Sequence, residues 1–285
     1  MRPQLHHISA FNMRFGALLA EWLPTSFKAR SGEPMTVRKS LAVLAAVFGL
    51  NLAVTGAVFA EPSHEAQAAY ERGVAAQQAG DMESAVTEWK EAAEGGHTGA
   101  AWILANLYDK GVGGVQQSDA KAYEFLLRAA RGGQPAAAVR LGEVYLQGNE
   151  NIGLKQNYEQ ALKSFEAASL AQRGDAQYYV SIMHRNGWGT PVDRTESLRW
   201  LLLSANKRYA PAFAELGRVH MEGDGVVKSR IDGWGYLLLA NRFGDAGQRA
   251  AADELMEKYE GWMKPGEKEK AQEMANTWIA SHGGA

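Results

Sequence analysis

A repeated pattern of apolar and small side chains runs along the chain from about residue 66. Four glycines, Gly111, Gly148, Gly187 and Gly223, follow one another at spacings of 37, 39 and 36 residues. Four kinds of residue recur at fixed distances before each glycine. They are an alanine (Ala100, Ala137, Ala176 and Ala212), a branched apolar residue (Leu104, Leu141, Val180 and Leu216), a small residue (Ala105, Gly142, Ser181 and Gly217) and an aromatic residue (Tyr108, Tyr145, His184 and His220). Intervals of three to five residues place these side chains on one face of a helix that ends at the glycine. The small residues allow a second helix to approach closely.

The pattern of a second helix follows each glycine. It begins with a short polar residue of the kind preferred at helix N-caps, at Ser118, Asn157, Asp193 and Ser229. Four residues later stands a small side chain, and large apolar residues come next, at Phe125/Leu126, Phe165, Trp200/Leu201 and Tyr236/Leu237. Seven such columns in four copies predict four helical hairpins, over residues 98–133, 134–172, 173–208 and 209–244.

The segments on either side of these hairpins are less regular. Residues 61–97 predict a shorter hairpin, with Gly73 in the small position of its first helix, Asp81 as N-cap and Trp89 in its second helix. Residues 245–285 predict two further helices, Asp245–Gly261 and Lys268–Ser281, which fit the columns poorly. Because the last unit of a repeat array must turn one face to water, we expect this pair to cap the array.

The columns resemble the Sel1-like repeat family, an α/α solenoid class related to the tetratricopeptide repeat. Its pattern, A…LG..Y..G.G followed by D/S/N…A..W/F…AA, is best matched at Ala101–Gly113 with Ala122–Gly133 and at Ala212–Gly225, and the resemblance covers roughly residues 97–244. The third repeat departs from it at Ser181 and His184, and the second carries the insertion Asn149–Gly153. The resemblance implies an all-α fold, a right-handed α/α superhelical solenoid of helical hairpins, in which residues 61–97 look like a tetratricopeptide hairpin.

The front of the chain has the pattern of a secretory signal peptide over residues 35–60. Arg38 and Lys39 form a short basic region, an apolar run follows, and the small side chains before residue 61 predict cleavage between Ala60 and Glu61. The predicted location is therefore periplasmic or secreted. The alternative is an uncleaved membrane anchor, because residues 41–60 contain no charge. Residues 1–34 are either a misannotated start, with translation beginning at Met35, or an unstructured leader.

Composition narrows the classes of function. The first 60 residues hold 6 of the 30 basic and 2 of the 32 acidic side chains, which leaves 24 and 30, a net charge of −6, in the rest. This mildly acidic body offers no basic stripe for nucleic acid, and we expect no nucleic-acid partner. We expect no stable membrane insertion once the signal is cleaved. The absence of cysteine excludes disulfides, thiolate metal sites and cysteine nucleophiles.

No pattern in the sequence points to catalysis. The histidines of the body show no metal-ligand spacing, and His184 and His220 stand in the aromatic column of a first helix, where packing is the favoured interpretation. The glycine turns lack a phosphate-loop lysine and follow helices instead of strands. We therefore expect no catalytic residue, no metal, no cofactor and no enzymatic activity.

The resemblance also implies a surface for binding a protein or peptide, since tetratricopeptide solenoids use the inner, concave face formed by their first helices. Transferring the ligand-facing positions of that repeat gives the candidates Tyr70, Val74, Gln77, Gln78, Trp102, Asn106, Asp109, Lys110, Val139, Glu143, Gln147, Tyr178, Ile182, Arg185, Asn186, Arg218 and Glu222. For Trp102 and Tyr178 the alternative is packing against a neighbouring hairpin. Trp188, in a turn, is a further candidate, and its alternative is an inward fold that covers the end of a hairpin.

These features predict an exported, non-catalytic adaptor that binds a protein segment and regulates an envelope or signalling complex. Two alternatives stay open. One is a structural component of an envelope machine, and the other is a peptidoglycan-active envelope enzyme, which would need a convergent carboxylate pair or an activated nucleophile. Neither the partner nor the oligomeric state follows from the sequence.

Overall fold

The computed structural model describes residues 62–283. This part of the chain contains twelve α-helices, one short 3₁₀-helix and no β-strand. In chain order they are α3 His64–Gln78, α4 Met82–Glu94, α5 Thr98–Lys110, α6 Asp119–Arg131, α7 Pro135–Gln147, η2 Glu150–Ile152, α8 Tyr158–Ser169, α9 Gly174–Asn186, α10 Arg194–Asn206, α11 Ala210–Glu222, α12 Arg230–Phe243, α13 Ala246–Glu260 and α14 Glu267–Ser281. The predicted all-α class is confirmed.

The predicted leader, signal peptide and cleavage site between Ala60 and Glu61 lie outside the described residues. Within residues 62–283, no helix combines the length and the apolar character that crossing a membrane requires.

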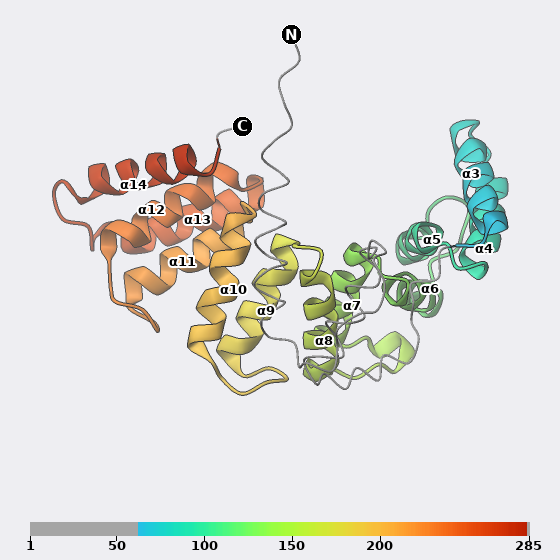
Figure 1. The fold of residues 1–285 in the computed structure, drawn as a ribbon, viewed down its shortest axis with the longest axis horizontal. Coiled ribbons are helices and arrows are strands. Elements are labelled where there is room, and N and C mark those ends of the chain that lie inside the picture. Colours follow the sequence, from blue (N-terminus) through green and yellow to red (C-terminus); the bar gives the residue numbers. More distant parts are fainter. Residues whose placement is uncertain (1–61, 284–285) are drawn as a thin grey trace, which may run out of the picture. The chain divides into compact units, whose positions relative to one another are not determined.

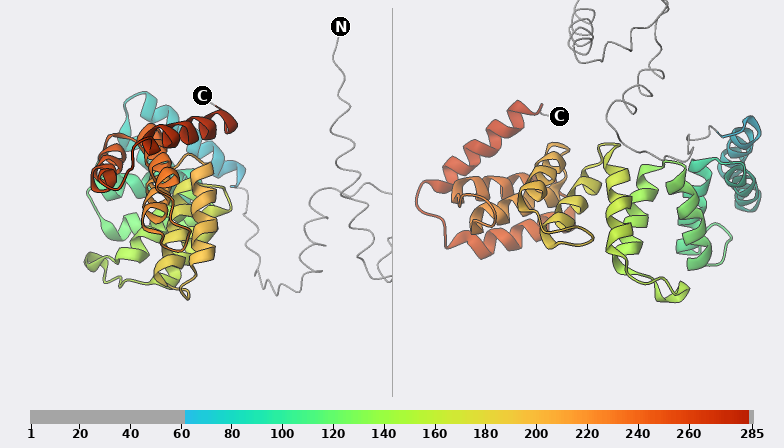
Figure 2. Two further views of the ribbon diagram at one scale, coloured as in Figure 1. Left: turned by 90° about the vertical axis from the view of Figure 1, so that its left-hand side faces the viewer. Right: turned by 60° about the horizontal axis from the view of Figure 1, so that its bottom comes forward.

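The helices pair into hairpins, as the sequence predicts. α3 packs on α4, α5 on α6, α7 on α8, α9 on α10 and α11 on α12. We call the earlier member of each pair its first helix and the later member its second helix. Each second helix also contacts the first helix of the next hairpin. Figure 1 shows the hairpins in sequence order from α3 to α12, and the right view of Figure 2 shows the same succession.

Each hairpin turn uses the local chemistry expected of it. The side chains of Ser118, Asn157, Asp193 and Ser229 each accept a hydrogen bond from the backbone N–H three residues later, so all four predicted N-caps are confirmed. Gly111, Gly187 and Gly223 end their helices in the left-handed conformation, with φ of 63°, 71° and 77°. A side chain in that conformation would be strained, which explains glycine at these positions.

The column of small residues marks where first and second helices approach most closely. A Cβ atom on Gly142 would lie 2.6 Å from the Phe165 ring, and one on Gly217 would lie 2.7 Å from Leu237. In the third repeat the small residue is Ser181, whose hydroxyl lies 3.1 Å from that of Ser197. Close helix contact therefore holds in the repeat that departs from the family pattern as well.

The insertion after Gly148 changes the local geometry of the second repeat. Gly148 has φ 77° and ψ 179°, unlike the left-handed glycines of the other repeats. The backbone N–H of Asn149 then donates to the carbonyl of Leu154 at 2.7 Å, which closes a compact loop around η2. η2 contacts α6, so the insertion reaches back to the preceding hairpin.

The last two helices pack on the hairpin formed by α11 and α12. α12 contacts both α13 and α14, and α11 contacts α13. Phe213 of α11 is fully buried there, with ring centroids of Phe243 and Trp278 at 5.7 and 5.0 Å. Arg230, the first residue of α12, forms an ion pair at 2.7 Å with Glu267, the first residue of α14.

Candidate functional site on the first helices

Apart from Trp188, which lies in the turn after α9, the candidate binding residues lie on first helices, that is, on α3, α5, α7, α9 and α11. Gln77, Asp109, Lys110, Gln147 and Glu222 are exposed, whereas most of the others are half-buried. Val139 is a correction to the prediction: only 7% of its surface is exposed, and it packs in the core with residues of α8 and α9. A side chain so buried is not available to a partner, and Val139 is removed from the surface.

Three of the aromatic candidates, Tyr70, Trp102 and Tyr178, are partly buried and pack against core side chains. Tyr70 stacks on His97, with ring centroids 4.0 Å apart, and closes the start of α5 against α3. Tyr178 lies between Tyr179 and Tyr209, at centroid distances of 6.0 and 5.6 Å. Burial raises the pKa of the Tyr178 hydroxyl, so the ring is a neutral part of the junction between α9 and α11.

The two arginine candidates are held in a network of ion pairs. Arg185 of α9 pairs with Glu215 of α11 and lies 3.3 Å from Asp224. Arg218 pairs with Glu215 at 3.0 Å, with Asp224 at 2.8 Å and with Glu222. These half-buried guanidinium groups already have carboxylate partners, so a ligand would have to displace those partners. We therefore assign Arg185 and Arg218 to the junction between the third and fourth repeats.

The same network continues to the C-terminal helices through Glu222. Tyr259 and Lys258 of α13 donate to its carboxylate at 2.5 and 3.0 Å. Although partial burial opposes the shift, these hydrogen bonds and the charge of Arg218 lower the pKa of Glu222 to about 2. Glu222 therefore ties α11 to α13.

Beside Trp102 and Asn106 the structure is hollowed into a cavity. Helices α5, α6 and α7 form its walls, and the insertion around η2 closes one side. The side chains that line it include Trp102, Asn106, Asp109, Asp119, Tyr123, Leu126, Arg140, Val144, Asn149 and Ile152. Trp102 and Asn106 are candidate residues predicted from the sequence. Sequence reasoning missed Asp119, Tyr123, Arg140, Asn149 and Ile152, because they come from a second helix, from the next repeat and from the insertion.

One position in the repeat sets the chemistry of each junction between hairpins. The residue after the helix-ending glycine lies against the first residue of the preceding second helix. Asn149 donates to Asp119 at 3.2 Å, and Asp224 lies 3.6 Å from Arg194. Trp188 stacks on Tyr158, with ring centroids 5.3 Å apart and planes 5° apart. The inward alternative for Trp188 is thus confirmed. The contact is polar at Asn149, aromatic at Trp188 and ionic at Asp224.

The two histidines of the aromatic column lie on the first helices α9 and α11. His184 and His220 are half-buried, and the Nδ1 atom of each is buried without a hydrogen-bond partner there. Among residues 62–283, no three His, Cys, Asp or Glu side chains are grouped so that they could hold a metal ion. The His220 ring faces Tyr236 at a centroid distance of 5.4 Å, as expected for a packing role.

Burial of His220 predicts a pH dependence of stability. Burial lowers its pKa below the ordinary 6.5, against a smaller opposing effect of Asp232, and burial also lowers the pKa of His97. The unfolded chain then binds more protons below pH 6.5, so stability is complete above that pH and decreases as the pH falls through it. Urea unfolding between about pH 7.5 and 5.5 should show this decrease, and it should be smaller in His220→Gln. An equal decrease in the variant would contradict the assignment to His220.

Comparison with known proteins gives a family match over the regular hairpins. The family model described as Sel1 repeat matches residues 98–134, 135–171, 174–209 and 211–242. The C-terminal helices and the first hairpin lie outside these matches.

Two similar proteins carry the same name, exopolysaccharide production negative regulator. The one from Rhizobium meliloti (strain 1021) is 30% identical over 204 residues, which is 64% of this chain and 75% of the relative. The one from Rhizobium leguminosarum bv. viciae is 29% identical over 158 residues, so the match spans 52% of this chain and 59% of that relative.

Two solved structures share the fold. A protective antigen of uropathogenic Escherichia coli strains that displays an SLR fold superposes with a TM-score of 0.64 and 21% identity, covering 76% of this chain and 46% of the antigen. A Sel1 repeat protein from Oxalobacter formigenes gives a TM-score of 0.55 and 23% identity, covering 65% of this chain and 74% of that protein. At these identities the likeness concerns the fold alone.

Proposed function

Because this chain belongs to the Sel1 repeat family, we propose that it is a non-catalytic adaptor that binds an extended segment of another protein along its first helices. The observation that carries the proposal is the cavity beside Trp102 and Asn106. It lies where the ligand-facing positions of the repeat predict contact, and its lining mixes an aromatic ring, an amide and charged groups. Tryptophan and arginine are the residue types that most often dominate binding energy at protein interfaces.

The binding surface that we propose is smaller than the sequence predicts. It consists of Gln77 on α3, Trp102, Asn106 and Lys110 on α5, and Glu143 and Gln147 on α7. Glu143 accepts a hydrogen bond from the hydroxyl of Tyr179 at 3.0 Å, which fixes its side chain toward the next repeat. Ile182 is half-buried on α9 and extends this surface, whereas Tyr178, Arg185 and Arg218 serve the junctions.

The names of the two rhizobial relatives bear on the process that this adaptor controls. Both are called negative regulators of exopolysaccharide production. We infer the same class of role for this chain, namely binding a protein that controls polysaccharide output and restraining it. A periplasmic or secreted location, which the signal-peptide pattern of residues 35–60 predicts, would place that partner in the cell envelope.

A deletion and complementation experiment tests this role. Deleting the gene should raise exopolysaccharide production, and the wild-type chain should restore the lower level. Trp102→Ala should restore it poorly at an equal amount of protein on an immunoblot, because loss of a central aromatic residue typically costs about 2 kcal/mol or more of binding. Glu166→Gln on α8 is the control and should restore the wild-type level. Unchanged polysaccharide after deletion would contradict the regulatory role.

A further inference from the structure

The cavity between α5, α6 and α7 contains a carboxylate whose partners are neutral. Asp119 accepts hydrogen bonds from the side-chain amides of Asn149 and Asn151, at 3.2 and 2.6 Å. These bonds lower the pKa of the Asp119 carboxyl, so it is ionised at neutral pH. No lysine or arginine nitrogen within residues 62–283 lies within ion-pair distance of it. The other carboxylate of the cavity, Asp109, has Arg140 at 3.7 Å.

The corresponding place between α9, α10 and α11 shows what this position of the repeat can hold. The residues of the two places correspond when they are counted from the glycine and the N-cap of each repeat. Arg185 and Arg194 stand where the earlier place has Asp109 and Asp119. Glu215 and Asp224 stand where it has Arg140 and Asn149. There the guanidinium groups of Arg185 and Arg194 lie 3.3 and 3.6 Å from Asp224. The fold therefore accommodates a guanidinium group beside a carboxylate at this junction. At the earlier junction Asp119 supplies a carboxylate, and residues 62–283 place no lysine or arginine beside it.

The remaining walls of the cavity suit a cationic side chain. Trp102 and Tyr123 present aromatic rings, and aromatic faces attract ammonium and guanidinium groups. The hydroxyls of Tyr123 and Tyr145 form a hydrogen bond of 3.0 Å. Burial and this bond raise the pKa of Tyr123 to about 12, so its side chain stays neutral. With Asp109, Asp119 and Arg140 counted, the cavity carries a net charge of −1, and the chain beyond residue 60 is acidic as a whole.

We propose that this cavity binds an arginine or lysine side chain of the partner segment, with the cation beside Asp119 and its aliphatic stem against Trp102. The proposal rests on the proposed function, because it names the chemistry of the partner that the first helices bind. It requires a basic residue in an extended segment, and the chain's acidic charge favours the approach of such a segment.

Selection of random linear peptides against the full chain tests this inference. Selected peptides that compete at Trp102 should share a required arginine or lysine, and its replacement by alanine in a synthetic peptide should weaken binding. Asp119→Asn should weaken the binding of the same peptide by about tenfold to a hundredfold, since hydrogen bonds to charged groups carry that range of affinity. Against Asp119→Asn, the alanine substitution in the peptide should then cost little more.

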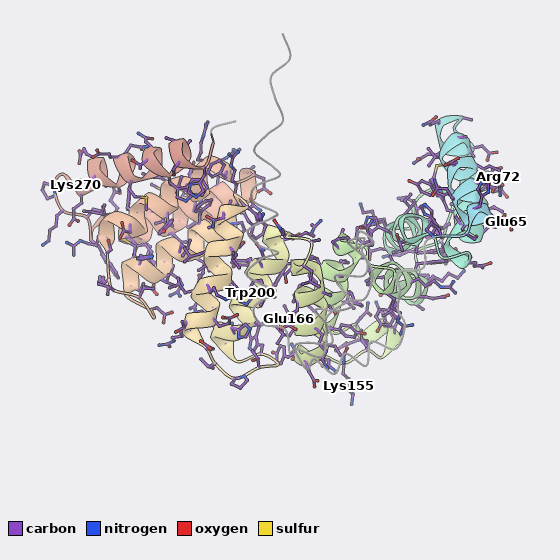
Figure 3. The ribbon with its side chains drawn as sticks, in the orientation of Figure 1. Glu65, Arg72, Lys155, Glu166, Trp200 and Lys270 are labelled. Atoms are coloured by element: carbon purple, nitrogen blue, oxygen red, sulfur yellow. The ribbon has the colours of Figure 1, made fainter. Side chains whose placement is uncertain are left out.

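Two further variants keep this test decisive. Glu166→Gln removes the same charge from an exposed position on α8, labelled in Figure 3, and should leave the affinity unchanged. Asp119→Arg places in the first repeat the residue that the third repeat holds at this position, and should abolish binding while circular dichroism stays that of the wild type.

The possible outcomes separate this proposal from the broader one. Peptides that bind at Trp102 without a required basic residue, and bind Asp119→Asn equally well, would overturn the cavity proposal and leave the proposed function standing. A selection in which no peptide depends on Trp102 would contradict both. An equal loss of affinity in Glu166→Gln would show that net charge, and not this cavity, attracts the peptide, and would also overturn the proposal.

Discussion

Replacing Phe213 with alanine should lower the free energy of unfolding by about 3–5 kcal/mol. Its ring is fully buried between α11, α12 and α14, in contact with Phe243 and Trp278. The loss combines the apolar area exposed to water with the cavity that the aromatic cluster cannot fill. Urea unfolding followed by circular dichroism measures it, and hydrogen exchange should show lost protection across α10 to α14.

Phe213→Leu is the matched control for this truncation. It retains most of the buried area at the same site, so its cost should be clearly smaller than that of alanine. A change of less than about 1 kcal/mol in the free energy of unfolding of Phe213→Ala would contradict the packing of α14 against α11 and α12 described above.

Replacing Trp89 with alanine should also cost about 3–5 kcal/mol, but at the other end of the array. Trp89 is fully buried on α4 against Gly73 of α3, where an added Cβ would lie 2.5 Å from the indole. Because each hairpin of a solenoid contacts its neighbours alone, the loss should stay local. Hydrogen exchange should therefore show unprotected amides in α3 and α4 and in the adjoining α5, with α10 to α14 unaffected.

Trp89→Phe separates packing from hydrogen bonding at this position. The indole Nε1 is buried without an acceptor among residues 62–283. Phenylalanine removes this unsatisfied N–H while it keeps most of the ring, so the variant should be much more stable than Trp89→Ala. Loss of protection throughout the chain in Trp89→Ala would contradict the local behaviour expected of stacked hairpins.

The features that the sequence predicts well are those determined within one hairpin. Caps such as Asp193 act on an N–H three residues away, and a glycine such as Gly187 acts on its own φ. The small-residue column works in the same way, since Gly142 and Phe165 belong to one hairpin. Local chemistry repeated in four copies therefore predicted the helices, their ends and their pairing.

The candidate site could be predicted only in part, because it depends on contacts between hairpins. The tetratricopeptide pattern places Val139 and Arg185 on the ligand-facing side, but Val139 is buried in a core shared by α7, α8 and α9, and Arg185 pairs with Glu215 of the next repeat. A signal for that pairing is present in the aligned repeats: Asp109 and Arg140 stand where Arg185 and Glu215 stand two repeats later, with opposite charges. The reach of the insertion back to Asp119 had no such signal.

Site-specific photocrosslinking in the native cell tests most directly that the first helices form the binding surface. A photoreactive residue is placed at Asn106 on α5 or, as the matched control, at the exposed Glu166 on the second helix α8. The account predicts a crosslink from position 106 to one protein of defined mass, which disappears when Trp102 is also changed to alanine, and none from position 166. Equal crosslinks from both positions, or a crosslink from position 166 alone, would contradict it.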